Sequence, residues 1–301
     1  MMKTINIAFK SEQEKIDFVN DCEADFERRL DEATKKITSS SVINILLSGP
    51  TCSGKTTTAN KIIGDYHEAG KEVTVISIDD FFYERDDART IKENEKIDYD
   101  SVEVIDLDKL KECITSAKPG NNIKVPIFDF VTQSRLGYNS HYITTDEVLL
   151  YEGIQAVYPE VTSLFDDEFI GVFINVNEDV CLNGILFSRD EIRLVRRLVR
   201  DRKFRGASAD FTFYLWETVR ENEDKNIFPN KNICSVQLDS FMGYELFLIK
   251  PYILDVLSEV GADSPYFEKA KNLIGKFLNL DEIKYEYIPK NSLYTEFLGK
   301  K

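Results

Sequence analysis

The sequence predicts an α/β fold in which a mainly parallel sheet is flanked by helices. Between residues 42 and 176, short apolar runs alternate with segments of helical pattern, which is typical of parallel strands joined by helices. The chain has 301 residues, 43% of them hydrophobic, enough to bury the core of one large or two small domains. The expected strands are residues 42–47, 72–78, 122–128, 147–153 and 170–176.

Two helical regions are expected to flank this alternation. Residues 1–40 are interpreted as an N-terminal helical leader, because residues 11–37 are rich in charge and fit a mostly solvated helix before "TSSS" interrupts them. The leader contains no recognisable catalytic or binding motif. Two explanations for it are open: it packs against the core, or an upstream domain to which it would belong is missing. Residues 41–301 are expected to form the main domain, with helices over residues 244–301.

The stretch "LLSGPTCSGKTTTANKI" joins the first strand of the main domain to a helix. Its spacing Gly49-x-x-x-x-Gly54-Lys55-Thr56 matches the phosphate-loop motif. The glycines let backbone N–H groups turn toward phosphate oxygens, and the helix N-terminus adds a partial positive charge. Lys55 would reach the outer phosphates, and the Thr56 hydroxyl is placed for Mg²⁺.

The strand before this loop and the helix after it argue against a chance glycine–lysine turn. We therefore expect a P-loop NTPase fold that binds a nucleoside triphosphate. Cys52 could be a reactive thiol, but a small filler whose side chain points away from the phosphates is favoured. The loop residues expected at the nucleotide are Gly49, Pro50, Thr51, Cys52, Ser53, Gly54, Lys55, Thr56 and Thr57.

Carboxylates end two other expected strands. Asp79 and Asp80 follow the run at 72–78, and Glu152 follows the apolar residues of the run at 147–153. Open α/β sheets bind ligands beyond the carboxyl ends of their strands. One carboxylate there can accept the proton of an attacking hydroxyl, and others can help to hold Mg²⁺. A helix N-cap by Asp79 or Asp80 is the structural alternative.

A basic segment, "RLVRRLVRDRKFRGAS", stands out in this acidic chain. On a helix, four of its arginines share one face at i, i+3, i+4 and i+7 spacing. They are Arg193, Arg196, Arg197 and Arg200. A lid over about residues 189–212 would bring such charges onto transferring phosphates, whereas the alternative is a solvated basic face that pairs with nearby acids. The polar residues 85–99 could form a lid or an acceptor-binding insertion.

The charge balance and the cysteine content limit the classes of binding partner and the cellular compartment that we expect. With 38 Lys and Arg against 53 Asp and Glu, the formal net charge of −15 disfavours nucleic acid or an anionic membrane as a partner. Five scattered cysteines form no disulfide framework and point to a reducing compartment. A signal peptide and a membrane-length apolar run are both lacking, so a cytoplasmic protein is expected. The run "NKNI" lacks the final carboxylate of the motif with which GTPases recognise guanine, so a GTPase switch is disfavoured.

Taken together, these motifs resemble those of the phosphoribulokinase/uridine kinase family, and in particular bacterial uridine-kinase-like nucleoside kinases. The N-terminal segment similar to threonyl-tRNA synthetase that such kinases often carry is not expected here. The resemblance runs from about residue 42 to the C-terminus. It rests on "GPTCSGKTTTA", "ISIDDFFYERD", "DYDSVEVIDLD", "VPIFDFVTQSR", "LLYEGIQAVYPE", "RLVRRLVRDRKFRGASADFT", "YELFLIKPY" and "IPKNSLYTEFLG".

The resemblance implies roles for residues on the catalytic side. Asp79 would be the general base for the acceptor hydroxyl, and Lys55 would act on the phosphates. Thr56, Glu152 and Asp79 would hold Mg²⁺, partly through water. Arginines of the lid and acceptor site would contact the nucleotide or the acceptor, with Arg200 taking part in catalysis; they are Arg197, Arg200 and Arg205.

For the acceptor, the resemblance implies a nucleoside pocket. Asp100, with Tyr99 beside it, would bind the sugar hydroxyls, and Phe128 and Phe130 would sandwich the base. Uridine kinases read the pyrimidine with a tyrosine and a histidine where this chain has Phe128 and Gln133. Two further departures are Ala207, in place of a second arginine, and Gln155, in place of a histidine. The amide of Gln133 can still hydrogen-bond a base edge, but the acceptor stays open.

The favoured function is ATP- and Mg²⁺-dependent phosphoryl transfer to a hydroxyl of a small metabolite, with the 5′-hydroxyl of a nucleoside as the favoured acceptor. A kinase of another acceptor, such as a sugar phosphate or a pantothenate-like molecule, is one alternative. A non-catalytic, nucleotide-gated binding protein is another. The sequence does not distinguish ATP from GTP, and it leaves assembly into a homo-oligomer, as relatives often show, undecided.

Overall fold

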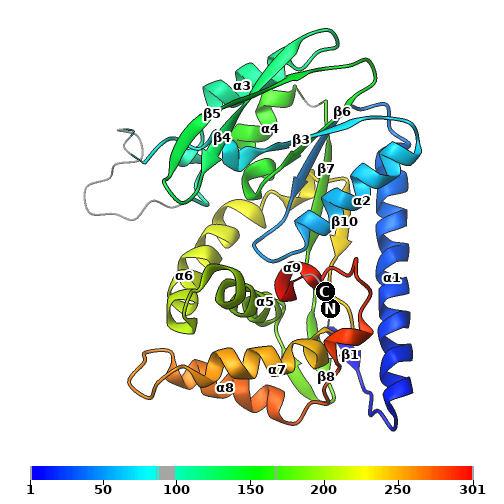
Figure 1. Cartoon of the computed structure of the whole chain (residues 1–301), viewed down its shortest axis with the longest axis vertical. Coiled ribbons are helices and arrows are strands. Elements are labelled where there is room, and N and C mark those ends of the chain that lie inside the picture. The colour runs from blue at the N-terminus through cyan, green and yellow to red at the C-terminus, as the bar shows by residue number, and fades with distance from the viewer. Residues whose placement is uncertain (1, 86, 88–98, 167, 300–301) are drawn as a thin grey trace.

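A five-stranded parallel sheet forms the centre of the computed structural model, which describes residues 2–85, 87, 99–166 and 168–299 (Figure 1). The strand order is β10-β7-β2-β6-β3, and every neighbouring pair is parallel. The predicted α/β class with a mainly parallel sheet is therefore confirmed. The strands are β2 (Asn44–Ser48), β3 (Val73–Ser77), β6 (Val148–Glu152), β7 (Ile170–Asn175) and β10 (Val236–Asp239).

The central strands are apolar along their length because both faces of the sheet are covered. Ile45 and Leu47 of β2 join the core on one face, whereas Leu46 joins the core on the other face. In the register of the sheet, Leu47 pairs with Glu152 of β6 and with Val172 of β7. The carboxyl ends of these strands therefore meet at one edge, and the loops that follow them lie together.

The helices have well-defined ends. α5 starts with a capping box between Ser188 and Glu191 and stops at Gly206, whose φ of 62° is left-handed. No helix in the described part of the chain combines the length and the apolar composition that a bilayer span requires. The helices are α1 (Glu12–Thr38), α2 (Lys55–Glu68), α3 (Leu107–Ser116), α4 (Pro159–Thr162), α5 (Arg189–Arg205), α6 (Ala209–Asn222), α7 (Glu245–Ser258), α8 (Phe267–Leu278) and α9 (Thr295–Leu298).

The N-terminal segment is built into the same core as the sheet. α1 lies along β10 and α2 (Figure 1), with its Val19, Phe26 and Ile37 side chains buried in the core cluster that also contains the β2 residues. β1 (Met2–Ile5) pairs in parallel with β8 (Asp179–Leu182), which pairs with β9 (Ile185–Phe187). Of the two possibilities for the leader, packing against the core is the one observed.

Residues 122–128 form a strand, but it is not part of the parallel sheet. β4 (Asn122–Asp129) pairs with β5 (Ser134–Tyr142) in an antiparallel hairpin, with an irregularity between Ile127 and Phe128. Ile123, Pro126 and Phe128 of β4 are buried, whereas the residues between them are more accessible, as expected for a strand with one solvated face. The expectation that this run joins the main sheet was therefore wrong, and the hairpin instead projects beside β3 (Figure 1).

The packing of α1 predicts that the leader contributes to global stability. Ile37 is fully buried, so Ile37→Ala should lower the free energy of unfolding by about 2–5 kcal/mol, since it removes apolar contacts and leaves a cavity. Urea denaturation measures this change. Lys36→Ala, at the exposed neighbouring position, should change it by less than about 0.5 kcal/mol. An Ile37→Ala protein as stable as the parent would show that the leader is not part of the cooperative core.

Candidate active site

The loop between β2 and α2 is a tight turn that requires glycine at two positions. A Cβ atom on Gly49 would overlap the carbonyl oxygen of Ile174, and one on Gly54 would lie 2.5 Å from the Leu293 side chain. Gly54 also has a φ of 101°, which L-residues with a side chain rarely adopt. Ser48, before the loop, donates from its hydroxyl to the Ile154 carbonyl at 2.8 Å. The loop is therefore anchored to the segment that follows β6.

The loop offers groups that suit a phosphate. The Lys55 ammonium lies over it, 3.0 Å from the Gly49 carbonyl oxygen and 3.4 Å from that of Pro50. The Ser53 hydroxyl is buried and has no hydrogen-bond partner among the described residues. The first N–H groups of α2 have no intrahelical acceptor. A cradle closed to side chains, with a cation and the donors of a helix N-terminus, fits an anionic phosphate.

Cys52, in the middle of the loop, is only 6% exposed and adopts a left-handed φ of 57°. Its thiol lies 3.9 Å from the Thr51 hydroxyl, within the weak hydrogen-bonding range of sulfur. These features are those of a small buried side chain, and they accord with the expected filler role.

Asp79 and Glu152 lie at the same edge of the sheet as the loop. Ser77, at the end of β3, pairs with Glu152, and Asp79 follows two residues later in a short 3₁₀ helix (Ile78–Phe81). Burial, and then the negative charge of Glu152, raise the pKa of Asp79 to about 7. The positive charge of Lys55 opposes that rise, whereas Asp100 and Asp80 add to it. The carboxylates and the loop lysine thus lie in one electrostatic environment.

The adjacent carboxylates Asp79 and Asp80 have different surroundings. Asp80 Oδ1 accepts a hydrogen bond from the backbone N–H of Phe128 at 3.3 Å, so its carboxylate holds the β4–β5 hairpin. The N-cap position of the 3₁₀ helix is Ser77, and no side chain caps that helix. The N-cap alternative for these aspartates is therefore not observed.

The donor set of the carboxylate edge suits Mg²⁺. Thr56 is exposed at the start of α2, and the mutual repulsion of Asp79 and Glu152 would be relieved by a cation near both. Within the described ranges, no three His, Cys, Asp or Glu side chains gather into a metal site of their own. Mg²⁺ at phosphate-transfer sites is typically held by one or two protein ligands, water and the substrate phosphates, so these residues fit that ion.

Tyr99 and Asp100, the residues expected to bind the sugar, are held beside this edge by hydrogen bonds to their backbone carbonyls. Gln155 donates from its side-chain amide to the Tyr99 carbonyl, and the Tyr158 hydroxyl donates to the Asp100 carbonyl, both at 2.8 Å. Gln155 and Tyr158 follow Glu152 along the chain. Sequence reasoning noted Gln155 only as a departure from relatives and missed this positioning role, for which the sequence alone carries no signal.

An aromatic group lies on the hairpin side of the same edge. The rings of Phe128 and Phe130 are 5.2 Å apart at 70°, and Phe82 contacts both as well as Tyr99. Phe128 is 6% exposed, whereas Phe130 is 56% exposed and offers a free ring surface. Phe82 was not singled out from the sequence, although it follows the aspartate pair by two residues in "IDDFFYE".

Gln133 lies in the turn of the β4–β5 hairpin, with a left-handed φ of 53°. Its carbonyl oxygen accepts a hydrogen bond from the backbone N–H of Arg85 at 3.0 Å. This contact joins the hairpin to the start of the segment expected to be an acceptor-binding insertion, residues 85–99. Most of that segment lies outside the described residues.

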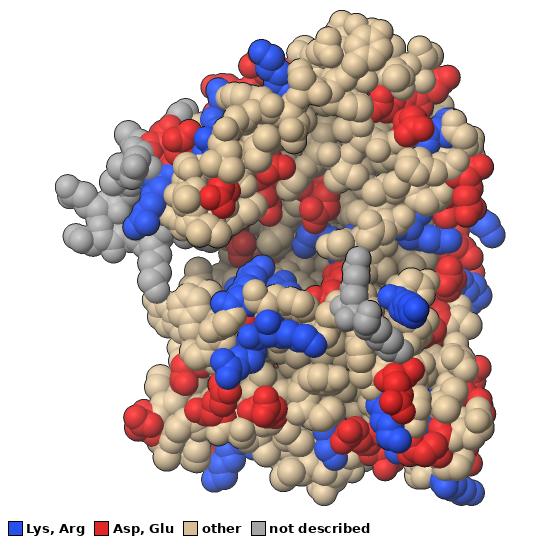
Figure 2. All heavy atoms as spheres, viewed as in Figure 1, with Lys and Arg blue, Asp and Glu red and all other residues tan. Residues whose placement is uncertain are grey.

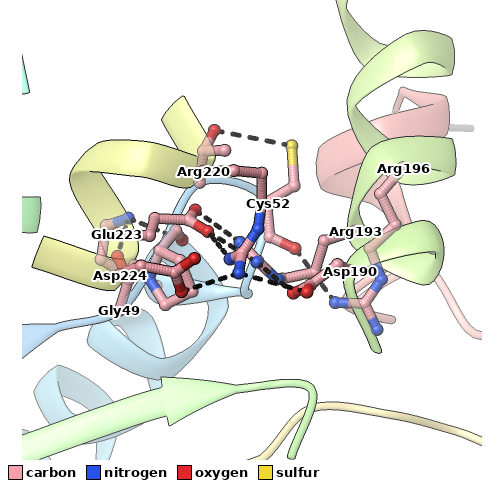
Figure 3. A network of polar contacts seen from close by, with 11 residues as sticks. Gly49, Cys52, Asp190, Arg193, Arg196, Arg220, Glu223 and Asp224 are labelled. Carbon is pink, nitrogen blue, oxygen red and sulfur yellow. Dashed lines mark hydrogen bonds and ion pairs between the residues drawn. The ribbon is translucent and has the colours of Figure 1, made fainter. Parts of the chain in front are cut away.

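Two of the four arginines predicted on one face of α5 are buried structural residues. Arg193 is fully buried and donates to both oxygens of Glu223, at 2.6 and 2.7 Å, and to Asp190 at 2.9 Å (Figure 3). Arg220 joins the same carboxylates. Arg193 therefore ties α5 to the end of α6 and does not face the phosphates.

Arg196 is also fully buried, and its guanidinium hydrogen-bonds to the backbone of the phosphate loop. The guanidinium pairs with both oxygens of Glu245, at 2.7 and 2.8 Å. It donates to the carbonyl of Cys52 at 3.0 Å (Figure 3). It also contacts the hydroxyl and carbonyl of Ser240. Arg196 thus connects α5, α7 and the end of β10 to the loop.

The other two arginines of the predicted α5 face gather around Asp201, together with Arg205. Arg197, Arg200 and Arg205 lie 3.2, 2.7 and 3.5 Å from its carboxylate oxygens. Burial, and then the positive charges of Arg200 and Arg197, lower the pKa of Arg205. Figure 2 shows basic side chains along the lower edge of a hollow, over α5, and acidic side chains within it. One carboxylate serves three guanidinium groups, so this side of the hollow favours a further anion.

Residues 189–212, expected as a lid, span α5 and the start of α6. Residues 192–199 are buried, and exposure begins at Arg202. Movement of this segment stays a prediction, and only its exposed end, residues 202–208, could move without disrupting the core.

Comparisons with known proteins agree with this geometry. The family model described as "Phosphoribulokinase / Uridine kinase family" matches residues 43–242, which span the sheet from β2 to β10. Uridine kinase of Ureaplasma urealyticum serovar 10 is 30% identical over 199 residues, covering 66% of this chain and 88% of that protein. Uridine kinase of Limosilactobacillus reuteri is 29% identical over 192 residues, covering 63% of this chain and 79% of that protein.

Among solved structures, one described as a possible uridine kinase from Bacillus stearothermophilus superposes with a TM-score of 0.50. The two chains are 17% identical, and the match covers 71% of this chain and all of the other, so the likeness concerns the fold. Because the family model matches two thirds of the sequence, this chain belongs to the phosphoribulokinase/uridine kinase family and is a phosphotransferase.

Proposed function

We propose that the protein transfers the terminal phosphoryl group of ATP, with Mg²⁺, to a hydroxyl of a small metabolite, with the 5′-hydroxyl of a nucleoside as the favoured acceptor. The observation that carries the proposal is the position of Asp79. It follows a strand whose end pairs with Glu152, and it senses the charge of Lys55 in the phosphate loop. Relatives named uridine kinase support the choice of a nucleoside.

In this mechanism Asp79 is the general base. The acceptor oxygen attacks the terminal phosphorus, its proton passes to the Asp79 carboxylate, and the bond from that phosphorus to the bridging oxygen of ADP breaks. A pKa of about 7 keeps part of Asp79 ionised near neutral pH while leaving it basic enough to take the proton. Mg²⁺, when bound, would neutralise phosphate charge beside Thr56 and Glu152.

Two groups of side chains would stabilise and orient the reactants. Lys55 would interact with the outer phosphates, and the arginines around Asp201 would add positive charge as the phosphoryl group transfers. Asp100 would accept hydrogen bonds from the sugar hydroxyls, and the exposed ring of Phe130 would stack on the base. An acceptor with its own phosphate is the second candidate, because Arg197 and Arg200 could hold that phosphate.

A binding protein without turnover is disfavoured by the carboxylate edge. Burial and the charge of Glu152 raise the pKa of Asp79, so its ionised form is energetically costly at this position. A protein that only binds a nucleotide does not require such a carboxylate, whereas a catalyst does. Turnover, measured beside binding, therefore distinguishes a kinase from a binding protein.

Replacement of Lys55 tests the phosphate loop. Lys55→Ala should lower kcat by several orders of magnitude, because the charge on the outer phosphates is lost while the backbone cradle remains, and nucleotide affinity should fall less. Steady-state kinetics and calorimetry measure the two effects. Lys71→Ala, at an exposed position after α2, is the matched control and should behave as the parent. Near-normal turnover of Lys55→Ala would rule out the phosphate-loop assignment.

Replacement of Asp79 tests the general base. Asp79→Asn keeps the size of the side chain but cannot take the proton, so kcat should fall by about 10²–10⁴ with ATP binding preserved. In the parent, kcat/KM should fall as the pH drops through the pKa of Asp79, because the protonated carboxyl can no longer accept a proton. That pKa is about 7 without Mg²⁺ and lower with it, since a nearby cation favours the carboxylate. The variant should lose this pH dependence.

Asp80→Asn is the matched control for Asp79→Asn. Its amide oxygen can still accept from the Phe128 N–H, so activity should stay near that of the parent. Melting temperatures of both variants exclude unfolding as the cause of any loss. An inactive Asp80→Asn beside a normal Asp79→Asn would place the base one residue later, and full activity of both would remove the base from the mechanism.

Replacement of Asp100 separates the acceptor classes. Asp100→Ala should raise the KM for a nucleoside strongly and spare ATP binding, since the contact to the sugar hydroxyls is lost. The control is Asp108→Ala, an exposed carboxylate in the first turn of α3. A parent protein that leaves nucleosides untouched but phosphorylates another hydroxyl compound would refute the nucleoside as acceptor and keep the kinase.

A further inference from the structure

The C-terminal tail, residues 289–299, lies against the phosphate loop. Glu296 Oε1 accepts hydrogen bonds from both the backbone N–H and the hydroxyl of Thr57, with an N···O distance of 2.5 Å for the first. Leu293 packs beside Gly54, close enough that a Cβ on that glycine would lie 2.5 Å from it. Figure 1 shows α9 next to the loop that precedes α2. A carboxylate from the tail therefore occupies donors of the loop.

Those donors are ones that a nucleotide would use. Thr57 is the third residue of α2, so its N–H has no intrahelical acceptor and points toward the cradle at the helix N-terminus. In a phosphate loop, N–H groups of this kind bind the inner phosphates of the nucleotide. Glu296 and an inner phosphate cannot both hold this N–H. Burial raises the pKa of Glu296, because its charged form is poorly solvated there, so the carboxylate occupies this N–H at a cost that its departure would relieve.

A cavity opens from the same residues. It has a volume of about 750 Å³ and lies between α1, the first turns of α2 and the tail. Its lining includes Thr56, Thr57 and Asn60 of α2, Phe26 of α1, and Asn291 and Glu296 of the tail. Cavities of 300–1,000 Å³ are typical of small-molecule sites. The cavity is thus large enough for a nucleoside and begins where the phosphates would lie.

The position of the cavity separates it from the acceptor edge. α1 packs along β10, at one edge of the sheet, whereas Asp79 follows β3 at the other edge, with the phosphate loop after β2 between them. A donor that enters from the α1 side would present its terminal phosphate to an acceptor on the β3 side. This arrangement is compatible with in-line phosphoryl transfer, in which the attacking and leaving oxygens lie on opposite sides of the phosphorus.

The chemistry of the lining suits the uncharged part of a nucleotide. The wall carries Glu23, Glu27 and Glu296 together with Lys61 and Lys290. Because Lys61 is already paired with Asp31 and Asp65, at 2.7 and 3.0 Å, the wall has no excess of positive charge to attract phosphate groups into the cavity. Asn60 and Asn291 are exposed amides that can both donate to and accept from a base edge, and Phe26 offers apolar contact.

We propose that this cavity holds the base and sugar of the donor nucleotide, and that an inner phosphate of that nucleotide replaces Glu296 on Thr57. The proposal rests on the proposed function in taking a nucleoside triphosphate as the donor. The family match ends at residue 242, so the tail residues in this site lie beyond it.

Binding without an acceptor tests the cavity. Calorimetry would compare Mg²⁺–ATP with tripolyphosphate, which carries the phosphates but no nucleoside. In Asn60→Trp the indole would fill the cavity, so the Kd for ATP should rise at least tenfold while the Kd for tripolyphosphate stays at the parental value. The control is Asn279→Trp, at the exposed end of α8.

Unchanged ATP affinity in Asn60→Trp would overturn the cavity as the nucleoside site. An equal loss of ATP and tripolyphosphate would overturn it too, because the side chain would then act on the phosphates. Both results would leave the proposed reaction intact. Conversely, a parent that binds ATP in this way but transfers no phosphoryl group would refute the proposed function and keep the site.

Replacement of Glu296 tests the second part of the proposal. Glu296→Gln keeps the size and an acceptor oxygen but removes the charge that competes with phosphate, so the Kd for both ATP and tripolyphosphate should fall severalfold. Glu282→Gln, an exposed glutamate before the tail, should match the parent. Unchanged or weaker binding by Glu296→Gln, with a parental melting temperature, would show that Glu296 does not compete with the nucleotide. If the melting temperature falls instead, Glu296→Asp, which keeps the charge on a shorter side chain, should also tighten binding, and failure to do so would overturn this part.

Discussion

The buried guanidinium of Arg196 is the interaction on which the geometry of the site depends. It holds the Cys52 carbonyl of the phosphate loop, Ser240 after β10 and the Glu245 carboxylate of α7. The Tyr294 hydroxyl of the tail donates to the same Glu245 carboxylate at 2.6 Å. Breaking a buried ion pair by removing one partner typically costs about 3–5 kcal/mol, because the other charge is left unpaired. One charge therefore fixes the loop relative to the sheet, α7 and the tail.

Around this fixed loop, carboxylates predominate on one side of the site and guanidinium groups on the other. Carboxylates gather beyond β3 and β6, where Glu152 helps to raise the pKa of Asp79. Guanidinium groups gather at the end of α5, where Arg200 and Arg197 help to lower the pKa of Arg205. Each group is under like-charge repulsion that a ligand of opposite charge would relieve. Mg²⁺ suits the first group and phosphate suits the second, so the same ligand complex would satisfy both.

The tail shows how residues outside the family match contribute to the site. Leu293 packs at Gly54, Glu296 binds Thr57, and the rings of Tyr294 and Phe297 lie over the Arg196 guanidinium at 5.7 and 5.4 Å. Their motif, "IPKNSLYTEFLG", contributed to the resemblance, but no role followed from it. Only the folded chain brings these residues, more than 230 positions away along the chain, to the loop.

The sequence by itself determined the features that are local along the chain. A glycine-rich loop between strand and helix, and carboxylates directly after apolar strands, are short patterns, and parallel strands bring their ends to one edge. Only the tertiary structure decided which polar groups face that edge. Helical spacing places Arg193 and Arg200 on one face. In the folded chain, however, Arg193 pairs with Glu223 in the interior, whereas Arg200 pairs with Asp201 beside the hollow. The adjacent Asp79 and Asp80 separate in the same way, because the Phe128 N–H binds one of them. Local spacing determines where a side chain starts, whereas a partner distant in the sequence determines whether its charge is paired, and no local pattern encodes that partner.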